Sequence, residues 1–184
     1  MQDGESKTRA SKAVSFCKQF VDLLKAGGLT DAELYDHANF QFVRWHKVAI
    51  NSAMNSTAVL TGGAGNQEVA IDPDLAKHAK GVMDEVLVTA SKVLDMPLKP
   101  TVEELKLASP EQVLASVRKN TTGSRPSMWH DWEKGQKMEL EVILGNPIRI
   151  AREYEIEMPR LQTMYALLKK AQERRDMEGQ GSKL

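Results

Sequence analysis

One lysine and two asparagines recur every four residues, at Lys47, Asn51 and Asn55, within a segment that is otherwise mostly apolar. At about 100° per residue, these side chains form one slowly drifting stripe along a helix. Because the other faces of this helix are apolar, we expect it to be largely buried, with its polar stripe facing a cleft or buried partners. Small-molecule sites are typically lined in this way. An alternative stays open, in which Lys47 reaches water along its aliphatic stem and the asparagines bond to nearby backbone groups.

A second group of polar and aromatic side chains follows later in the chain, and its members are Ser127, Trp129, Trp132 and Glu139. Each of them has a structural interpretation. Ser127 is a possible cap of the helix that follows it, and Glu139 is a possible first-turn carboxylate stabilised by the helix dipole. The two tryptophans lie three residues apart on one helix face, which favours packing against neighbouring helices over stacking on a base or a cofactor.

The 184 residues include 25 basic and 25 acidic side chains, so the formal net charge is zero. This balance argues against a nucleic-acid-binding or anionic-membrane surface, and we expect neither nucleic acid nor membrane as a partner. The N-terminus lacks the apolar stretch of a signal peptide, and no apolar run of about 18 residues exists to span a bilayer. The sequence therefore predicts a soluble, cytoplasmic protein.

Cys17 is the single cysteine, so it cannot form an intrachain disulfide. Apolar residues at helical spacing on either side of it predict a core residue in a reducing compartment rather than a catalytic thiol. The histidines are His37, His46, His78 and His130. They are not spaced as paired metal ligands, with one another or with Cys17, and we predict no metal site.

A glycine-rich stretch, Gly62-Gly63-Ala64-Gly65, follows a predicted helix rather than a strand. Phosphate-binding loops of nucleotide sites join a strand to a helix. We therefore interpret this stretch as a connector and expect no phosphate-binding loop in the chain.

Apolar residues at helical spacing recur throughout the chain, and no convincing alternating strand interrupts them. The first predicted helix covers residues 7 to about 26 and ends at Gly27-Gly28 in a left-handed cap. A turn with Asp31 as a possible cap leads to a second helix over residues 39 to 61. Residues 63 to 71 are predicted as a loop. A third helix begins at Asp72-Pro73, an N-cap followed by proline in the first turn, and ends near residue 94.

Two capping boxes are predicted next, formed by Thr101 with Glu104 and by Ser109 with Gln112. Helical patterns then cover residues 127 to 154, with breaks, and 159 to about 176. Pro147 is expected to kink the chain near residues 143 to 145 because it lacks an amide donor. The prediction is thus an all-α protein with a single helical domain over residues 1–178 and a disordered tail over residues 179–184.

Taken in order, four motifs resemble those of the C-terminal, all-helical domain of the ketopantoate reductases, the NADPH-dependent 2-dehydropantoate 2-reductases. That domain typically shows a Trp-x-Lys-x-x-x-Asn-x-x-x-Asn helix, a Ser-Ser-Met-x-x-Asp segment, a Thr-Glu-Ile-Asp-x-x-Asn-Gly segment and a final helix that begins at proline. The matching residues are Trp45, Lys47, Asn51, Asn55, Ser127, Met128, Asp131, Glu139, Gly145 and Pro159. The resemblance implies a fold like the C-terminal domain of 6-phosphogluconate dehydrogenase and a role in pantothenate biosynthesis.

The resemblance further implies the reduction of a ketone in a keto-acid substrate. Lys47 is then the general acid, which gives a proton to the carbonyl oxygen as hydride reaches the carbon. Asn51, Asn55 and Ser127 are implied to bind the carboxylate and hydroxyl of the substrate. Glu139 is implied to hold Lys47, the substrate and the nicotinamide ribose in register, which makes it both a catalytic and a cofactor-binding residue.

The chain also departs from the family pattern. The family carries an N-terminal Rossmann domain that binds NADPH, and nothing in this sequence matches one. Met138 stands where threonine is usual, Glu141 replaces aspartate, and Leu144 replaces the asparagine before the glycine. NADPH is therefore an expected cofactor only if an upstream or partner Rossmann domain supplies its site.

Two explanations follow from this partial match. The chain is either the substrate-binding and catalytic half of such a reductase, or a free-standing descendant without redox chemistry. The descendant would bind a small molecule or catalyse a non-redox step such as a cyclisation or an isomerisation. A purely structural dimerisation module is weaker, because it leaves the polar stripe unexplained. An apolar docking face predicts association with a Rossmann domain or with a second copy of the chain.

Overall fold

The computed structural model describes residues 2–181, and it describes side chains from Lys12 to Glu178. In this part of the chain every regular element is helical, and no strand occurs. The all-α prediction is confirmed. The chain divides between Phe40 and Gln41 into two compact units, whereas the sequence predicts one domain over residues 1–178.

The first unit contains α1 (Gln2–Ala26) and the first turn of α2 (His37–Leu60). Gly28 has φ +97°, and the Leu29 N–H bonds to the Leu24 carbonyl at 3.0 Å. These are the features of a left-handed helix cap, so the predicted end of the first helix is confirmed.

Two predictions in the first unit are wrong. The cap of α2 is Asp36 and not Asp31, because the Oδ1 atom of Asp36 accepts a hydrogen bond from the Asn39 N–H at 2.8 Å. Cys17 is exposed rather than part of a core. Its neighbour Phe16 on α1 is exposed as well, since so short a unit has too few residues to bury an apolar helix face.

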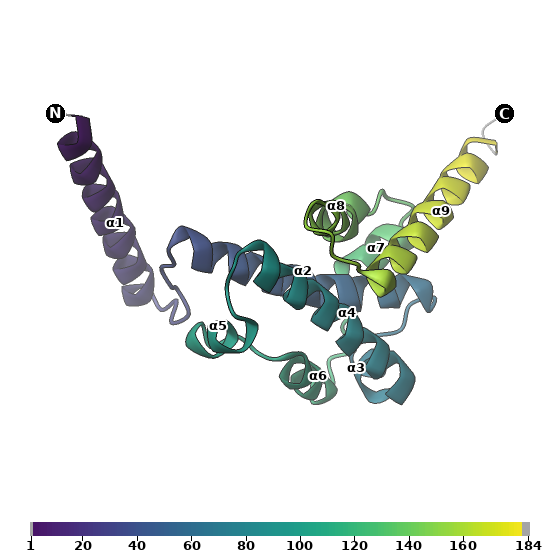
Figure 1. Ribbon diagram of the computed structural model, residues 1–184. Coiled ribbons are helices and arrows are strands. Elements are labelled where there is room, and N and C mark those ends of the chain that lie inside the picture. The colour runs from purple at the N-terminus through teal and green to yellow at the C-terminus, as the bar shows by residue number, and fades with distance from the viewer. Residues whose placement is uncertain (1, 182–184) are drawn as a thin grey trace. The chain divides into compact units, whose positions relative to one another are not determined.

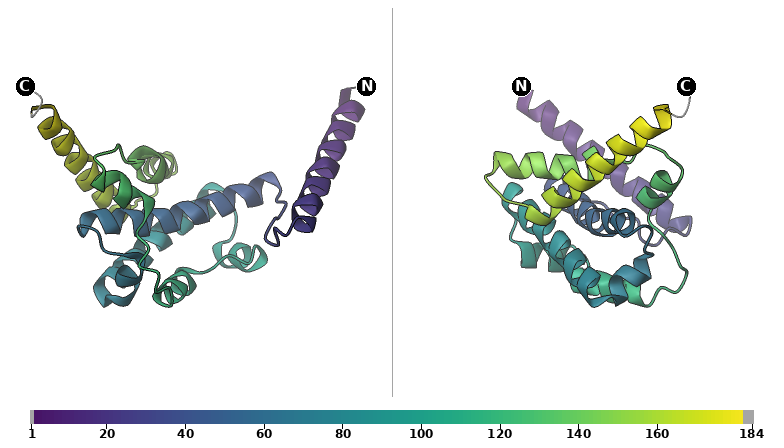
Figure 2. Two further views of the ribbon diagram at one scale, coloured as in Figure 1. Left: turned by 180° about the vertical axis from the view of Figure 1, so that it is seen from behind. Right: turned by 90° about the vertical axis from the view of Figure 1, so that its right-hand side faces the viewer.

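The second unit holds the remaining helices. They are α3 (Asn66–Ile71), α4 (Pro73–Val93), α5 (Leu98–Glu104), α6 (Pro110–Arg118), α7 (Ser127–Glu133), the π-helix η1 (Glu141–Gly145), α8 (Asn146–Glu153) and α9 (Pro159–Gly181). Within this unit α7, α8 and α9 lie on one side of α2, and α3, α5 and α6 lie on the other (Figures 1 and 2). Helix α4 contacts α3, α5, α6, α8 and α9, so it lies at the centre of the unit.

One apolar core joins these helices. Its fully buried members from α2, α4 and α9 include Ala53, Val82, Met83, Val86, Leu161, Met164 and Leu168. Burial of each larger side chain stabilises the fold by roughly 1.5–3 kcal/mol relative to exposure.

Two predicted helix starts in this unit are confirmed. The Asp72 carboxylate accepts from the Leu75 N–H at 2.8 Å at the start of α4. At the start of α6, the Ser109 N–H donates to Gln112 Oε1 at 2.8 Å, and the Gln112 N–H donates back to Ser109 Oγ at 3.3 Å. In both places a local sequence signal suffices, because the capping partners are at most three residues apart.

Two other local predictions are wrong. Thr101 is a buried residue inside α5 rather than a cap, because the helix has already begun at Leu98. The predicted loop over residues 63 to 71 contains α3, whose Val69 and Ala70 are fully buried where α3 packs against α4 and α6. A helix this short is unstable alone, so its formation depends on tertiary packing.

The predicted irregularity before Pro147 is confirmed as the π-helix η1. Pro147 has no N–H to offer the carbonyl of Ile143, the residue four positions earlier. That carbonyl instead accepts a hydrogen bond from the Ser52 hydroxyl at 2.9 Å. The break in the α-helical pattern is thus used to fasten η1 to α2.

The C-terminal helix α9 continues through Gly181, beyond the end of its apolar periodicity near residue 176. The predicted disordered tail covers residues 179–184, of which residues 182–184 lie outside the described residues.

Candidate functional site

The predicted polar stripe lies on α2 and runs from the protein surface into the interior. Lys47 is exposed, Asn51 is half-buried, and Asn55 is only 6% exposed. The fall in exposure along the stripe follows the helix as a whole, since every residue of α2 from Ser52 to Val59 is buried. The stripe therefore connects an open surface with the buried half of the helix.

The three side chains of the stripe have no polar partner within the described part of the chain. No side-chain atom of Lys47, Asn51 or Asn55 makes a hydrogen bond or an ion pair with another described residue. The alternative in which the asparagines bond to nearby backbone groups is therefore wrong. The Asn55 amide keeps some access to solvent, since the fully buried side-chain atoms without a partner in the described residues are Ser56 Oγ, Thr57 Oγ1, Asn66 Oδ1 and Trp129 Nε1.

The segment that carries Glu139 is fastened to the middle of α2. The Ser52 hydroxyl holds the Ile143 carbonyl, and the Ile143 N–H donates to the Glu139 carbonyl at 3.0 Å. Glu139 thus lies one helical turn before the contact with Ser52, which is itself one residue from Asn51. Its side chain is exposed at the start of a helical segment, a position that also fits the interpretation as a first-turn carboxylate.

The segment that carries Ser127 is fastened to the C-terminal end of α2. Gly63 has φ +108°, and a Cβ atom placed there would lie 2.6 Å from the Trp129 ring, so the indole packs directly on the glycine backbone. Ser127 lies two residues before this contact and is exposed. Its side chain caps no helix, because Pro126 is the N-cap residue of α7 and no side-chain cap hydrogen bond forms there.

The two tryptophans pack as predicted. Trp129 and Trp132 are both packed against the hydrophobic core. Each also carries a guanidinium group over its ring, Arg125 at 5.7 Å from the centroid of Trp129 and Arg175 at 4.8 Å from that of Trp132. Both rings are thus used in packing and cation–π contacts within the protein.

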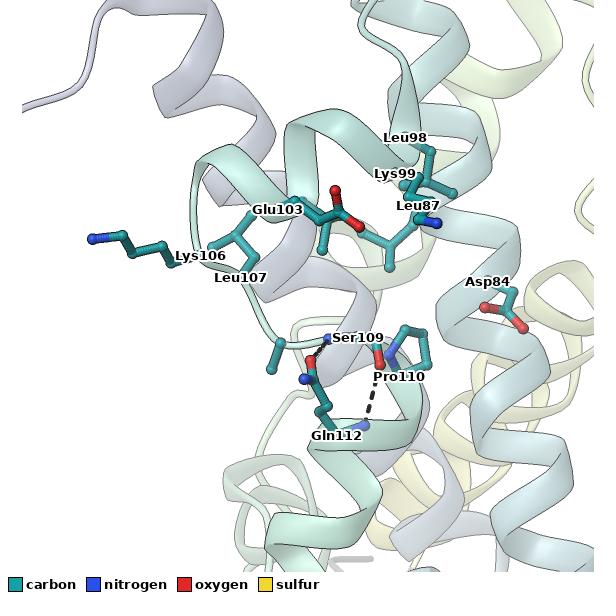
Figure 3. A pocket seen from close by; sticks show the side chains of 12 residues that line it. Asp84, Leu87, Leu98, Lys99, Glu103, Lys106, Leu107, Ser109, Pro110 and Gln112 are labelled. Carbon is teal, nitrogen blue, oxygen red and sulfur yellow. Dashed lines mark hydrogen bonds between the residues drawn. The ribbon is translucent and has the colours of Figure 1, made fainter.

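The predicted site residues line neither of two cavities found in the second unit. One cavity of about 800 Å³ lies between α4, α5 and α6, and its lining side chains include Leu87, Leu98 and Glu103 (Figure 3). None of the five predicted site residues lines this cavity. A smaller cavity of about 300 Å³ is lined by Trp45 of the first motif, by Val48, and by residues of η1 and α8.

The glycine-rich stretch after α2 is a connector between two helices, as predicted. The ring of Trp129 covers Gly63, which leaves no room for a phosphate at that backbone. No strand occurs in the described residues, so the strand-to-helix turn that opens a Rossmann dinucleotide site is not found among them. Within the same residues, no group of three or more histidine, cysteine or acidic side chains could hold a metal ion. No helix in the described residues has the length and apolar character of a membrane span.

Sequence reasoning missed several residues that hold the site segments in place. Ser52 fastens η1, and Gln172 and Arg175 of α9 bond to the backbone between α7 and η1. Glu141 accepts hydrogen bonds from Tyr165 at 2.5 Å and from Arg149 at 2.7 Å, and these two groups lower the pKa of its carboxyl. Only the π-helix could have been anticipated, from Pro147, because the other partners are distant in sequence.

Comparison with known proteins assigns this chain to a family. A family model described as "Ketopantoate reductase PanE/ApbA C terminal" matches residues 39–172. The chain belongs to this family. The resemblance inferred from the four motifs is confirmed, and the second unit is the C-terminal domain of the ketopantoate reductase family.

Individual relatives support the same assignment. An uncharacterized protein of Saccharomyces cerevisiae is 30% identical over 164 residues, which are 85% of this chain and 42% of the relative. The structure of 2-dehydropantoate 2-reductase from Methylococcus capsulatus is 31% identical with a TM-score of 0.60, and the match covers 73% of this chain and 40% of that chain. The dimeric ketopantoate reductase of Staphylococcus aureus is 25% identical with a TM-score of 0.60, over 86% and 51% of the two chains. The chain thus spans about half or less of the length of these relatives.

Proposed function

We propose that this ketopantoate reductase C-terminal domain forms the substrate-binding and catalytic half of an NADPH-dependent 2-dehydropantoate 2-reductase-like oxidoreductase. The observation that supports the proposal best is the stripe of Lys47, Asn51 and Asn55. Its polar groups make no hydrogen bond with the described residues while they pass from the surface into the interior. Burial of polar groups without partners is unfavourable unless a bound molecule completes their hydrogen bonds.

In this proposal Lys47 donates the proton that a ketone needs on its oxygen. Reduction of a 2-keto acid adds a hydride to the carbonyl carbon and a proton to the carbonyl oxygen, which yields a 2-hydroxy acid. The Lys47 ammonium gives up the proton and becomes a neutral amine. A positioned acid of this kind typically accelerates proton transfer by about 10²–10⁴-fold, because alkoxide charge does not have to build up unprotected.

The remaining residues bind and orient the substrate. Asn51 and Asn55 have amide donors and acceptors suited to a carboxylate and a hydroxyl, and Ser127 adds a hydroxyl from α7. Glu139 carries a carboxylate that can hold the Lys47 ammonium and the nicotinamide ribose. The hydride donor finds no site among the described residues, so NADPH would have to be bound by a Rossmann domain outside them.

A second candidate function is a non-redox activity, such as a cyclisation or an isomerisation, in a free-standing descendant of the family. One observation favours it. Leu144 occupies the position of an asparagine in the family motif and is completely buried, so an apolar core contact has replaced a polar group near Glu139.

Calorimetric titration of the 184-residue chain with NADPH, with ketopantoate and with both together tests the proposal. We expect ketopantoate to bind, and its affinity to fall at least about tenfold in Lys47→Ala, a loss of about 1.4 kcal/mol. Lys77→Ala is the matched control, because Lys77 is an exposed lysine on α4, and its affinity should be unchanged. If NADPH binds and is consumed, turnover should fall about 10²–10⁴-fold in Lys47→Ala.

Other results would distinguish the two candidates. Failure of ketopantoate to bind, or equal affinity of the wild type and Lys47→Ala, would contradict the reductase proposal. Conversion of ketopantoate without NADPH, followed by NMR of the small molecule, would instead support the non-redox candidate.

A further inference from the structure

The connection between α7 and η1 leads directly to Glu139 and has a defined conformation. Gly135 has φ +69°, and the Gln136 N–H donates to the Asp131 carbonyl at 2.7 Å, which closes α7 in a left-handed cap. Met138 and Leu140 are each only 3% exposed and flank the exposed Glu139. The two buried neighbours hold the backbone from which the Glu139 side chain projects.

Two side chains of α9 bond to this connection. The Met138 N–H donates to the Oε1 atom of Gln172 at 2.7 Å. The guanidinium group of Arg175 donates to the carbonyl of Gln136 at 2.9 Å and to that of Trp132 at 3.3 Å. Two backbone groups of the connection, at Gln136 and Met138, and one at the end of α7, at Trp132, thus bond to α9, and Met138 immediately precedes Glu139.

Arg175 is well placed for this role. Its side chain is 21% exposed, its guanidinium group lies over the ring of Trp132, and it also pairs with Asp176 at 3.0 Å. Because its planar fork donates in several directions at once, lysine could not replace these contacts. Arg175 lies three residues after the last residue matched by the family model, Gln172.

We infer that Gln172 and Arg175 are positioning residues, which hold the backbone before Glu139 so that its carboxylate is aligned with the substrate site on α2. This inference rests on the proposed function, because it assumes that Glu139 acts on a ligand held by that helix. The physical basis is that a carboxylate on an exposed segment loses alignment when its backbone is free to move.

The first test uses Gln172→Met, which keeps the length of the side chain but removes the acceptor, and Gln172→Glu, which keeps an acceptor for the Met138 N–H. Ketopantoate affinity is expected to fall about three- to tenfold in Gln172→Met, the size of one lost hydrogen bond. Gln172→Glu should keep the ketopantoate affinity of the wild type. Arg174→Met is the control on the same helix, because Arg174 is exposed and bonds to no described residue, and its affinity should equal that of the wild type.

A double-mutant cycle separates positioning from general stability. In a Glu139→Ala background, Gln172→Met should lower the affinity for ketopantoate no further. An equal loss of affinity in both backgrounds would overturn the inference, since Gln172 would then act independently of Glu139.

A measurement without ligand keeps this inference separate from the proposed function. We expect the ¹⁵N relaxation order parameter of the Glu139 amide to fall in Gln172→Met and in Arg175→Met, and to stay unchanged in Arg174→Met. If ketopantoate does not bind the wild type, the proposed function fails, and the order parameters still decide whether α9 holds Glu139. Unchanged order parameters in both variants would overturn the inference.

Discussion

Two polar regions of the second unit are similarly buried and differ in what they contact. The Glu85 side chain on α4 is 10% exposed and accepts hydrogen bonds from the backbone N–H groups of Arg160 and Leu161, at 3.1–3.2 Å, and from the Arg160 guanidinium at 3.0 Å. Asn55 on α2 is 6% exposed and has no partner among the described residues. Burial alone therefore does not tell whether a polar side chain has a hydrogen-bond partner within the protein.

The partners of Glu85 explain its structural role. It caps the N-terminus of α9, where Pro159 opens the helix and the next backbone N–H groups have no acceptor within it. The stripe on α2 has the opposite character, since the side chains of Lys47, Asn51 and Asn55 form no hydrogen bond with another described residue.

The largest expected effect comes from exchanging the two polar groups for alanine. Glu85→Ala leaves two backbone N–H groups and a guanidinium group without their acceptor, so we expect the free energy of unfolding to fall by about 2–4 kcal/mol. Asn55→Ala removes no internal hydrogen bond and should change it by less than about 1 kcal/mol. Urea denaturation measures both. A larger loss in Asn55→Ala than in Glu85→Ala would break the distinction between the two regions.

The next effect concerns the contact that brings Ser127 toward the end of α2. Gly63→Ala is expected to destabilise the fold by about 2 kcal/mol, because the new Cβ would collide with the Trp129 ring at a positive φ. Gly62→Ala is the control, since Gly62 has φ +74° with nothing within 4 Å of a Cβ atom, and it should cost less. Thermal denaturation of both variants gives the difference. Equal losses would mean that backbone strain alone explains the effect and that the indole contributes nothing.

A smaller effect is expected at the contact that fastens Glu139 to α2. Ser52→Ala removes the hydrogen bond to the Ile143 carbonyl and should lower stability by about 1 kcal/mol. Ketopantoate affinity should fall with it, because η1 carries the Glu139 segment. Denaturation and calorimetry on the same sample measure the two effects. A stability loss with unchanged affinity would show that η1 can shift without disturbing the stripe.

The smallest effect is a pH dependence in the region of Glu85. Burial, and then the charge of Arg160, lower the pKa of His78, while Glu85 opposes them. The unfolded chain therefore binds more protons at His78 than the folded chain, so this contribution to stability is present above pH 6.5 and is lost as the pH falls below it. We expect a loss of less than about 1 kcal/mol between pH 7.5 and 5.5, and a flatter profile in His78→Gln. An unchanged profile in that variant would contradict this assignment.

Short-range signals in the sequence predicted much of the fold. The left-handed cap at Gly28, the Asp72 cap and the capping box of Ser109 with Gln112 all formed where expected. Their partners lie within a few residues of one another, so no tertiary information is needed. The prediction failed at Thr101, which has the spacing of a cap but is buried inside α5.

The candidate site was predicted in part. The residues of the α2 stripe could be recognised because their four-residue spacing places them on one helix face. The anchors of the site could not, since Ser52 bonds to Ile143 and Gly63 packs against Trp129 across long stretches of sequence. Such pairs leave no local pattern, and either partner alone is compatible with many environments.

The sequence by itself determined the longer helices and that Lys47, Asn51 and Asn55 share a helix face, because backbone periodicity and capping act over short distances. It missed α3, a short helix that depends on tertiary packing. Only the tertiary structure decided that Asn55 has no internal partner while Glu85 has three donors. It also decided that α9 bonds to the backbone that precedes Glu139. The physical reason is that hydrogen-bond satisfaction depends on every neighbour in space, and those neighbours are brought together by burial of the whole core.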